Sequence, residues 1–459
     1  MSAAPLDFPE AFLHYIWKLN LYNQQALYTV GGEPLEICHQ GWHNHHAGPD
    51  FSNARIRIGK TLWAGQVEIH KRSSDWLLHQ HQHDPAYNNT ILHVVYEYDQ
   101  AIYRASGEEI ATLVLRGRIA PHYLQGYEKL LKSRTWIPCE QQLTPQVSQN
   151  CQLWLDRLAT ERLQEKIVGI EQQLEGNHYH WEQVFYQFLA ASFGMQQNQA
   201  PFEALALSLP LKILAKHKHS CLQLEALLLG QAGLLQQAKA TDNYVQTLCK
   251  EYQFLAQKYQ LTPLLGSSWK FGRMRPANFP TVRLAQFAQL IHQSRHLFSK
   301  IIQESDTQVI QGFFEVELSG YWKEHYRLGV PSKARKKRLG KRSIDLILIN
   351  TVAPFLVAYG RYKGDTDFME RALELLQKVA PEKNGMIKQW NELKVKARNA
   401  LDSQALLQLK KHYCDQRRCL ECHFGHQLLE QKTPNIRHYH DWSCTETKSK
   451  VFSSIKAKI

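Results

Sequence analysis

An alternating segment followed by a glycine-containing turn most constrains what the N-terminal part of this chain can fold into. In FSNARIRI, residues 51–58, apolar side chains at 54, 56 and 58 alternate with two arginines. Strict alternation predicts a half-buried strand. Gly59-Lys60-Thr61 then marks a turn, and residues 62–70 complete a predicted β-hairpin.

The residues around the hairpin predict a small α+β domain. Apolar residues at helical spacing predict a helix over 9–22, and residues 34–38 suit a short strand. Residues 75–87 are predicted as helix or irregular structure, and the β-branched segment 90–96 as a buried strand. The predicted order is helix, three strands, helix, strand, which gives a small mixed sheet with flanking helices.

The rest of the chain is predicted to be mainly helical. WLDRLATERLQEKI and WEQVFYQFLAASFG carry apolar residues three and four positions apart, as amphipathic helices do. We therefore expect four regions along the chain. They are an α+β domain at 1–135, a helical domain at 145–330, a helical C-terminal region at 331–432 and a flexible tail at 433–459.

Composition narrows the class of protein and its surroundings. Apolar residues form 44% of the 459 residues, which excludes a mainly disordered chain. The net charge of +13 favours a polyanionic partner, nucleic acid first. The N-terminus lacks the basic start of a signal peptide, and the most apolar stretch, 344–360, is read as too short and too polar to span a membrane. With an odd number of cysteines, nine, we expect a reduced, cytoplasmic protein without membrane association.

The hairpin also predicts a metal site. A three-residue turn pairs Ile58 with Leu62, and counting outward then places Asp50 opposite His70 and Ser52 opposite Glu68. Asp50, Glu68 and His70 would share one face, where they can bind a divalent metal and position a water. A one-residue slip would move Asp50 to the other face.

Residues 8–100 resemble the PD-(D/E)XK nuclease core, which places an Asp at the start of its second strand and Glu-x-Lys in its third. Asp50 and the run Glu68-Ile69-His70 stand at those positions, with His70 in place of the lysine and Lys71 beside it. Glu10 stands for the acidic residue that many members carry in the first helix. The resemblance implies a Mg²⁺- or Mn²⁺-dependent nuclease in which these five positions (10, 50, 68, 70 and 71) form the catalytic site.

Histidines are concentrated around the hairpin. Nine of the 23 fall within residues 39–93, in GWHNHHAGPD before the hairpin, in HQHQHDPAY after it and nearby. Both loops can fold over one site, and imidazole ligates transition metals or acts as a general base. We interpret His45, His46 and His81 as surface loop residues. A zinc hydrolase is an alternative, although no HExxH spacing is present in the sequence.

A cysteine cluster near the C-terminus predicts a second metal centre. Cys414, Cys419 and Cys422 follow a C-x4-C-x2-C spacing, which matches one iron–sulfur pattern. Zinc with three cysteines and one histidine fits equally well. The fourth ligand is open between one cysteine and three histidines: Cys444, His412, His423 and His426.

A basic run predicts contact with phosphates. SKARKKRLGKRS places seven positive charges in ten residues, including Lys336, Lys337, Arg338, Lys341 and Arg342. Dense positive charge attracts a phosphate backbone and releases its counterions. A second basic segment, RMRPANFPTVR, adds Arg275 to the predicted nucleic-acid surface.

The whole chain resembles an uncharacterised bacterial protein family of unknown function. The matching stretches are FLHYIWK, HAGPDF, WAGQVEIH, SSDW, LEALLLGQAGLL, RPANFPTVRLAQ, INTVAPFLVAYG and CLECHFG. Because this family supplies no activity, the functional prediction rests on the sites.

Those sites predict a metal-dependent nuclease or phosphodiesterase acting on DNA or RNA, either active or degenerate. Two alternatives stay open. One is a non-catalytic nucleic-acid-binding or scaffold protein, and the other is a zinc hydrolase of a small substrate.

Overall fold

The chain divides into two compact units. The computed structural model describes residues 8–44, 46–144, 151–236, 242–318 and 320–430. Unit 1 combines Met1–Cys151 with Lys410–Asp441, and unit 2 combines Gln152–Leu409 with Trp442–Ile459. The finer division drawn from the sequence stays a prediction, and the predicted tail lies outside the described residues.

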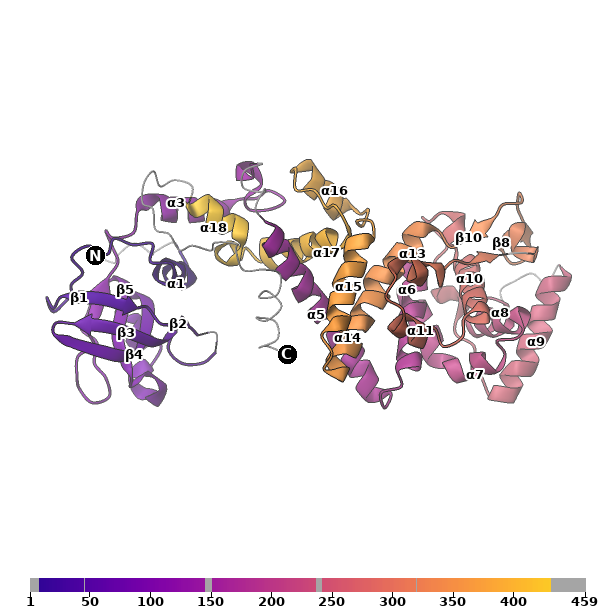
Figure 1. Ribbon diagram of the computed structural model, residues 1–459, viewed down its shortest axis with the longest axis horizontal. Helices are drawn as coiled ribbons and strands as arrows, with labels where there is room; N and C mark the ends of the chain where they lie inside the picture. Colours follow the sequence, from indigo (N-terminus) through magenta and orange to yellow (C-terminus); the bar gives the residue numbers. More distant parts are fainter. Residues whose placement is uncertain (1–7, 45, 145–150, 237–241, 319, 431–459) are drawn as a thin grey trace. The chain divides into compact units, whose positions relative to one another are not determined.

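Unit 1 is built on a mixed sheet, which confirms the predicted α+β class (Figure 1). The strand order is β1-β3-β4-β5-β6, and β2 pairs with β3. Pairing is antiparallel from β1 through β3 to β4, and parallel from β4 through β5 to β6. The strands are β1 (Leu35–His39), β2 (Trp42–His43), β3 (Phe51–Ile58), β4 (Thr61–Arg72), β5 (Thr90–Glu97) and β6 (Thr112–Val114).

The pattern of buried and exposed side chains explains why these segments form strands. In β3, Ala54, Ile56 and Ile58 are buried and the two arginines between them are exposed, so the alternating pattern is a half-buried strand. β5 is buried on both faces over 90–95, as its β-branched composition predicts. The helix α1 (Glu10–Lys18) precedes the sheet and ends earlier than predicted, and α2 (Asp75–Leu78) lies between β4 and β5.

The predicted register of the hairpin is wrong in its pairs but keeps the shared face. The turn is shorter than expected, because Gly59 adopts a positive φ of 58° and Ile58 pairs with Thr61. A bulge between Phe51 and Ala54 then shifts the register again, so that Phe51 pairs with Val67. Each shift alone would reverse the faces, whereas the two together restore them.

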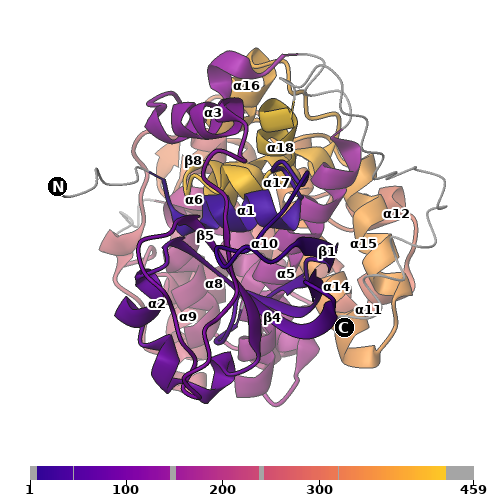
Figure 2. The same ribbon diagram turned by 90° about the vertical axis from the view of Figure 1, so that its left-hand side faces the viewer.

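Two helices that are far apart in the sequence lie side by side in unit 1. They are α3 (Pro121–Lys132) and α18 (His423–Glu430). Both views show α1 close to the sheet, with this helix pair beyond it (Figures 1 and 2). The guanidinium of Arg417 donates to the carbonyls of Leu130 (3.3 Å), Leu131 and Ser133 (2.8 Å). Arg417 therefore satisfies carbonyls that the end of α3 leaves without helical partners.

Unit 2 is mainly helical, as predicted. α5 packs against α17 and α14, and α8 packs against both α9 and α10. Its helices are α5 (Gln152–Gly176), α6 (Trp181–Ser208), α7 (Leu211–Lys216), α8 (Cys221–Gln231), α9 (Asn243–Tyr259), α10 (Pro280–Gln293), α11 (Leu297–Gln303), α12 (Thr307–Gly312), α13 (Lys341–Ile347), α14 (Ala353–Lys363), α15 (Asp367–Lys378), α16 (Gly385–Glu392) and α17 (Ala400–Leu409). Two short strand pairs complete it: β7 (Glu317–Leu318) with β10 (Lys337–Arg338), and β8 (His325–Arg327) with β9 (Val330–Pro331).

One apolar helix is longer than its sequence suggested. α13, a π-helical turn and α14 form a continuous helix, Lys341–Lys363, which by length and composition alone would be able to cross a membrane. Most of its apolar window is buried within the protein. A mostly buried helix of this kind is typical of the core of a soluble protein.

Candidate functional site

Two carboxylates meet where β3 begins. Asp50 directly precedes β3, and Glu68 lies in β4. The Asp50 N–H donates to Glu68 Oε2 (3.0 Å), and the Ile69 N–H donates to Asp50 Oδ2 (3.0 Å). The backbone of each strand thus fixes the carboxylate of the other, and the predicted proximity of Asp50 and Glu68 is present in the structure.

The helix α1 adds an acid and a base to these carboxylates. His14 Nε2 lies 3.1 Å from Asp50 Oδ2. Glu10, one turn earlier on the same helix face, interacts electrostatically with His14, Asp50 and Glu68. His14 was missed in the sequence, where its four-residue spacing from Glu10 was the available signal.

Four histidines extend the site from Glu68. His70 Nδ1 lies 2.8 Å from His93 Nε2, and His70 Nε2 lies 3.1 Å from His79 Nδ1. Glu68 Oε1 lies 3.6 Å from His70 Nε2 and 3.3 Å from His81 Nε2. The loop after β4 therefore folds over the sheet as expected.

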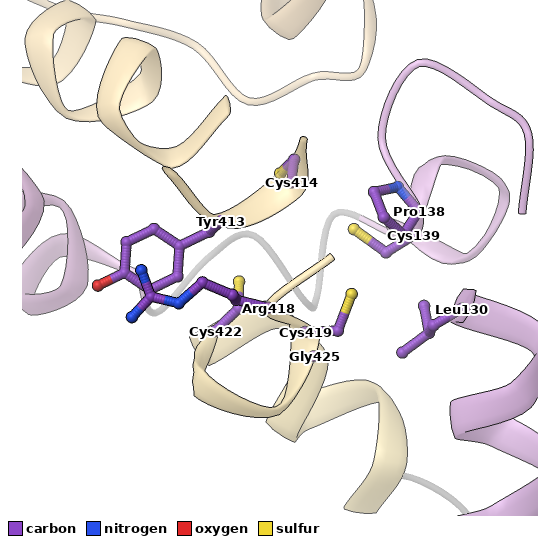
Figure 3. Close-up of a pocket in the computed structure, with 9 residues that line it drawn as sticks. All are labelled: Leu130, Pro138, Cys139, Tyr413, Cys414, Arg418, Cys419, Cys422 and Gly425. Carbon is purple, nitrogen blue, oxygen red and sulfur yellow. The ribbon is translucent and has the colours of Figure 1, made fainter. Parts of the chain in front are cut away.

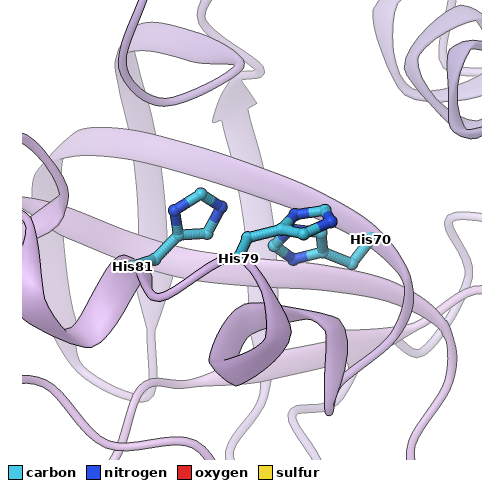
Figure 4. Close-up of side chains that lie close together, drawn as sticks. All are labelled: His70, His79 and His81. Carbon is cyan, nitrogen blue, oxygen red and sulfur yellow. The ribbon is translucent and has the colours of Figure 1, made fainter.

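Three of these imidazoles are placed to share one ion. Ligating atoms of His70, His79 and His81 all lie within 4.8 Å of one another (Figure 4). The interpretation of His81 as a surface loop residue is wrong, because its ring stacks on Tyr87 with a centroid distance of 3.8 Å and its Nε2 faces Glu68. His45 lies outside the described residues.

The electrostatics of the site favour a bound cation. Burial, then the charge of Asp50, raises the pKa of Glu68, and burial raises the pKa of Glu10 to about 7. Burial and the neighbouring histidines lower the pKa of His70 to about 2, while burial lowers that of His93 to about 3. Neutral imidazoles keep lone pairs for a metal, and a cation would offset the repulsion among the carboxylates.

The ligand types indicate which metals suit the site. Imidazole suits zinc, iron and related metals, whereas carboxylate oxygens suit Mg²⁺ and Mn²⁺. Glu68 contributes to both sets, with Oε2 directed to Asp50 and Oε1 to the histidines. Lys71 follows His70 in β4, so strand alternation directs it to the other face of the sheet.

The basic run lies in unit 2 and is only partly available for phosphate. Lys337 is buried, its Nζ donates to the Lys323 carbonyl (2.7 Å), and burial lowers its pKa, so its prediction as a phosphate ligand disagrees with its placement. Arg338 is exposed and paired with Glu317, and the guanidinium of Arg342 donates to the Lys383 carbonyl. The other predicted basic residues are exposed: Lys336, Lys341 and Arg275.

The three predicted cysteines lie in unit 1, all buried and none in a disulfide. The structure brings a fourth buried cysteine, Cys139, to Cys414, Cys419 and Cys422. Cys139 follows α3, far away in the sequence, so local spacing held no signal for it.

The fold and site define an α+β protein with a partly buried cluster of carboxylates and histidines suited to a metal. The chain belongs to a family described as "Protein of unknown function (DUF2851)", whose model matches residues 10–385. The match includes the carboxylate and histidine cluster and Cys139, and ends before Cys414. Comparison with curated proteins and with solved structures gives no match.

Proposed function

We propose that unit 1 is a divalent-metal-dependent phosphodiesterase acting on nucleic acid. The observation that carries this proposal is the proximity of Asp50 and Glu68: the Asp50 backbone N–H donates to the Glu68 carboxylate (3.0 Å), and Glu10 and His14 flank the two residues. Two carboxylates that share a cation can hold the metal against a phosphate and lower the pKa of its bound water.

The order of helices and strands in unit 1 supports the proposal of a nuclease. Helix, three antiparallel strands, helix and a parallel strand is the arrangement of the PD-(D/E)XK core that the sequence resembles. Asp50 directly precedes β3, the second long strand, and Glu68 lies in β4, the third, so we assign them the metal-ligand positions that the resemblance implies. Because one fold hosts many activities, the residues of the site carry more weight than the topology.

We assign the roles from the contacts. Asp50 and Glu68 hold the cation, with Glu10 as a third carboxylate, and His14 orients Asp50. His70 stands where the PD-(D/E)XK core has a lysine, and it positions the attacking water. The His70 ring is itself held by His93 (2.8 Å). With imidazoles this close, Mn²⁺ suits the site better than Mg²⁺. Lys71 has no part in this assignment because it faces away.

The charge of unit 2 supports a polyanionic substrate. Lys336, Lys341 and Arg275 are exposed and available to phosphates in solution. The free thiols of the described residues favour a reducing compartment, so we place this activity in the cytoplasm.

Cleavage assays test the proposal. The full chain should cleave DNA or RNA with Mn²⁺, and Asp50→Asn and Glu68→Gln should each abolish cleavage. Glu36→Gln is the matched control, because Glu36 is an exposed carboxylate of the same sheet and pairs with Arg57. Cleavage by both site variants at the parent rate would refute the proposal, and nucleic-acid binding without cleavage would leave a non-catalytic binding protein.

The three-histidine set favours a second candidate, a zinc hydrolase of a small substrate. His70, His79 and His81 with Glu68 provide the nitrogen and oxygen ligands that catalytic zinc uses. Stoichiometric zinc that is lost in His79→Ala and His81→Ala, with esterase activity and no cleavage of nucleic acid, would select this candidate.

A further inference from the structure

Four buried cysteines of unit 1 line one hollow. Cys139 follows α3, and the other three follow one another closely in the C-terminal segment of unit 1: Cys414 ends a π-helical turn, Cys419 begins a 3-10 turn and Cys422 immediately precedes α18. The hollow between them is partly open to solvent. Figure 3 shows the four side chains around the same space.

The four thiols are close enough to interact, and their spacing favours a group larger than a single ion. Among the described residues, only the three histidines of the other site bring three ligating atoms within 4.8 Å of one another. Tetrahedral zinc with Zn–S bonds of about 2.3 Å holds its sulfurs only about 3.8 Å apart. A cluster of several iron and sulfide ions is larger than one ion and separates its thiolates more widely.

The surroundings of the thiols favour a bound positive centre. Burial raises the pKa of Cys139 to about 12 and that of Cys422 to about 11. The thiols also act on one another: the charges of Cys422 and Cys419 raise the pKa of Cys139, and the charge of Cys139 raises that of Cys414. Burial therefore disfavours the thiolate form of these groups, and a bound metal would stabilise it.

The backbone around Cys422 is arranged for a thiolate. The N–H groups of Phe424 and Gly425, in the first turn of α18, donate toward Cys422. These hydrogen bonds partly offset the rise that burial causes in the pKa of Cys422. Gly425 also allows the close approach of the two segments, because a Cβ there would lie 1.9 Å from the Cys419 carbonyl oxygen. Hydrogen bonds to the sulfurs are a feature that tunes iron–sulfur centres.

We propose that Cys139, Cys414, Cys419 and Cys422 ligate an iron–sulfur cluster that fastens the C-terminal segment of unit 1 to the end of α3. Each thiol releases its proton to solvent as its sulfur bonds to iron, iron and sulfide are supplied as ions, and the cysteines keep their oxidation state. Arg417 joins the same two segments through its bonds to the α3 carbonyls. The cluster has a structural role here, independent of the proposed hydrolysis.

Cys139 is the fourth ligand in this proposal, the one whose identity the sequence left open. His426 Nε2 is 2.6 Å from the Leu420 carbonyl, to which it donates, and its ring packs edge-on against Tyr15. That nitrogen is therefore engaged away from a metal. Cys444 lies outside the described residues.

Anaerobic purification of the full chain tests the proposal. The parent protein should contain iron and acid-labile sulfide in equal amounts and absorb visible light. Cys139→Ser should lose most of the iron and the absorbance, whereas Cys38→Ser, at an exposed cysteine of the same unit, should keep both. Stoichiometric zinc without sulfide, or full cluster content in folded Cys139→Ser, would overturn the proposal.

Alkylation of the unaltered protein keeps the test decisive if the serine variant does not fold. In the anaerobic parent, iodoacetamide should modify Cys38 and spare the four clustered cysteines. After an iron chelator, those four should become reactive together. Reactivity of Cys139 before chelation, with the other three protected, would remove Cys139 from the ligand set.

Discussion

Substituting Gly425 with alanine should loosen the contact between α18 and the segment that carries Cys419. The added Cβ would lie 1.9 Å from the Cys419 carbonyl oxygen and 2.8 Å from its carbonyl carbon. Because these are backbone atoms, no side-chain rotation relieves the clash. A backbone contact this short belongs at the upper end of the overpacking cost of about 1–3 kcal/mol. Better helix propensity recovers up to about 1 kcal/mol, which leaves a net loss of about 2 kcal/mol.

Hydrogen exchange measures this loss where it arises. In peptides from α3 and α18, a change of about 2 kcal/mol in the free energy of opening corresponds to about 30-fold faster exchange. Gly169→Ala is the matched control, since Gly169 is also helical and a Cβ there meets nothing within 4 Å. Exchange in the Gly425→Ala protein as slow as in the parent would refute the packing argument.

The other predictions concern pH and charge. Mn²⁺ should raise the melting temperature more at about pH 8 than at about pH 5.5, because it binds carboxylates that have lost their protons. Without the cation the sign reverses: folding raises the pKa of Glu10 from 4.5 to about 7, so its contribution to the free energy of unfolding falls as pH rises through that window. Thermal melts of the parent and of Glu10→Gln, with and without Mn²⁺, check both of these pH dependences. A Mn²⁺-induced rise in melting temperature that is independent of pH would contradict the assignment of the carboxylates as metal ligands. Lys336→Ala with Lys341→Ala should weaken nucleic-acid binding and flatten its salt dependence by up to about 0.9 log unit per lost phosphate contact, measured by fluorescence anisotropy. Lys337→Ala should instead lower thermal stability, because the ammonium is buried and bonded to the Lys323 carbonyl; an unchanged salt slope in the double variant would exclude phosphate contact.

The hairpin shows what a sequence can and cannot specify. Alternation in β3 gave the strand and its faces, because burial on one side of a sheet follows from period-two patterning. The turn length and the bulge at Asn53, whose φ is 57°, were beyond that pattern. Asp50 and Glu68 still meet because the two register errors cancel.

Contacts between distant segments were less predictable than local ones. Cys139 joins the cysteine cluster and His14 joins the carboxylates through packing of elements far apart in the sequence. Burial of Lys337 within a dense basic run likewise depends on the strand that pairs with it, β7, and on the carbonyl it reaches. Spacing motifs describe neighbours in sequence, and these residues are neighbours only in space.

Calorimetric titration with Mn²⁺ tests most directly whether the paired carboxylates form a metal site. Asp50→Asn and Glu68→Gln should each weaken Mn²⁺ binding by at least about 10-fold, since each removes a ligand charge. Glu36→Gln should bind as the parent does, because the Glu36 carboxylate is exposed and pairs with Arg57. Equal Mn²⁺ affinity in the parent, Asp50→Asn and Glu68→Gln would contradict the metal site.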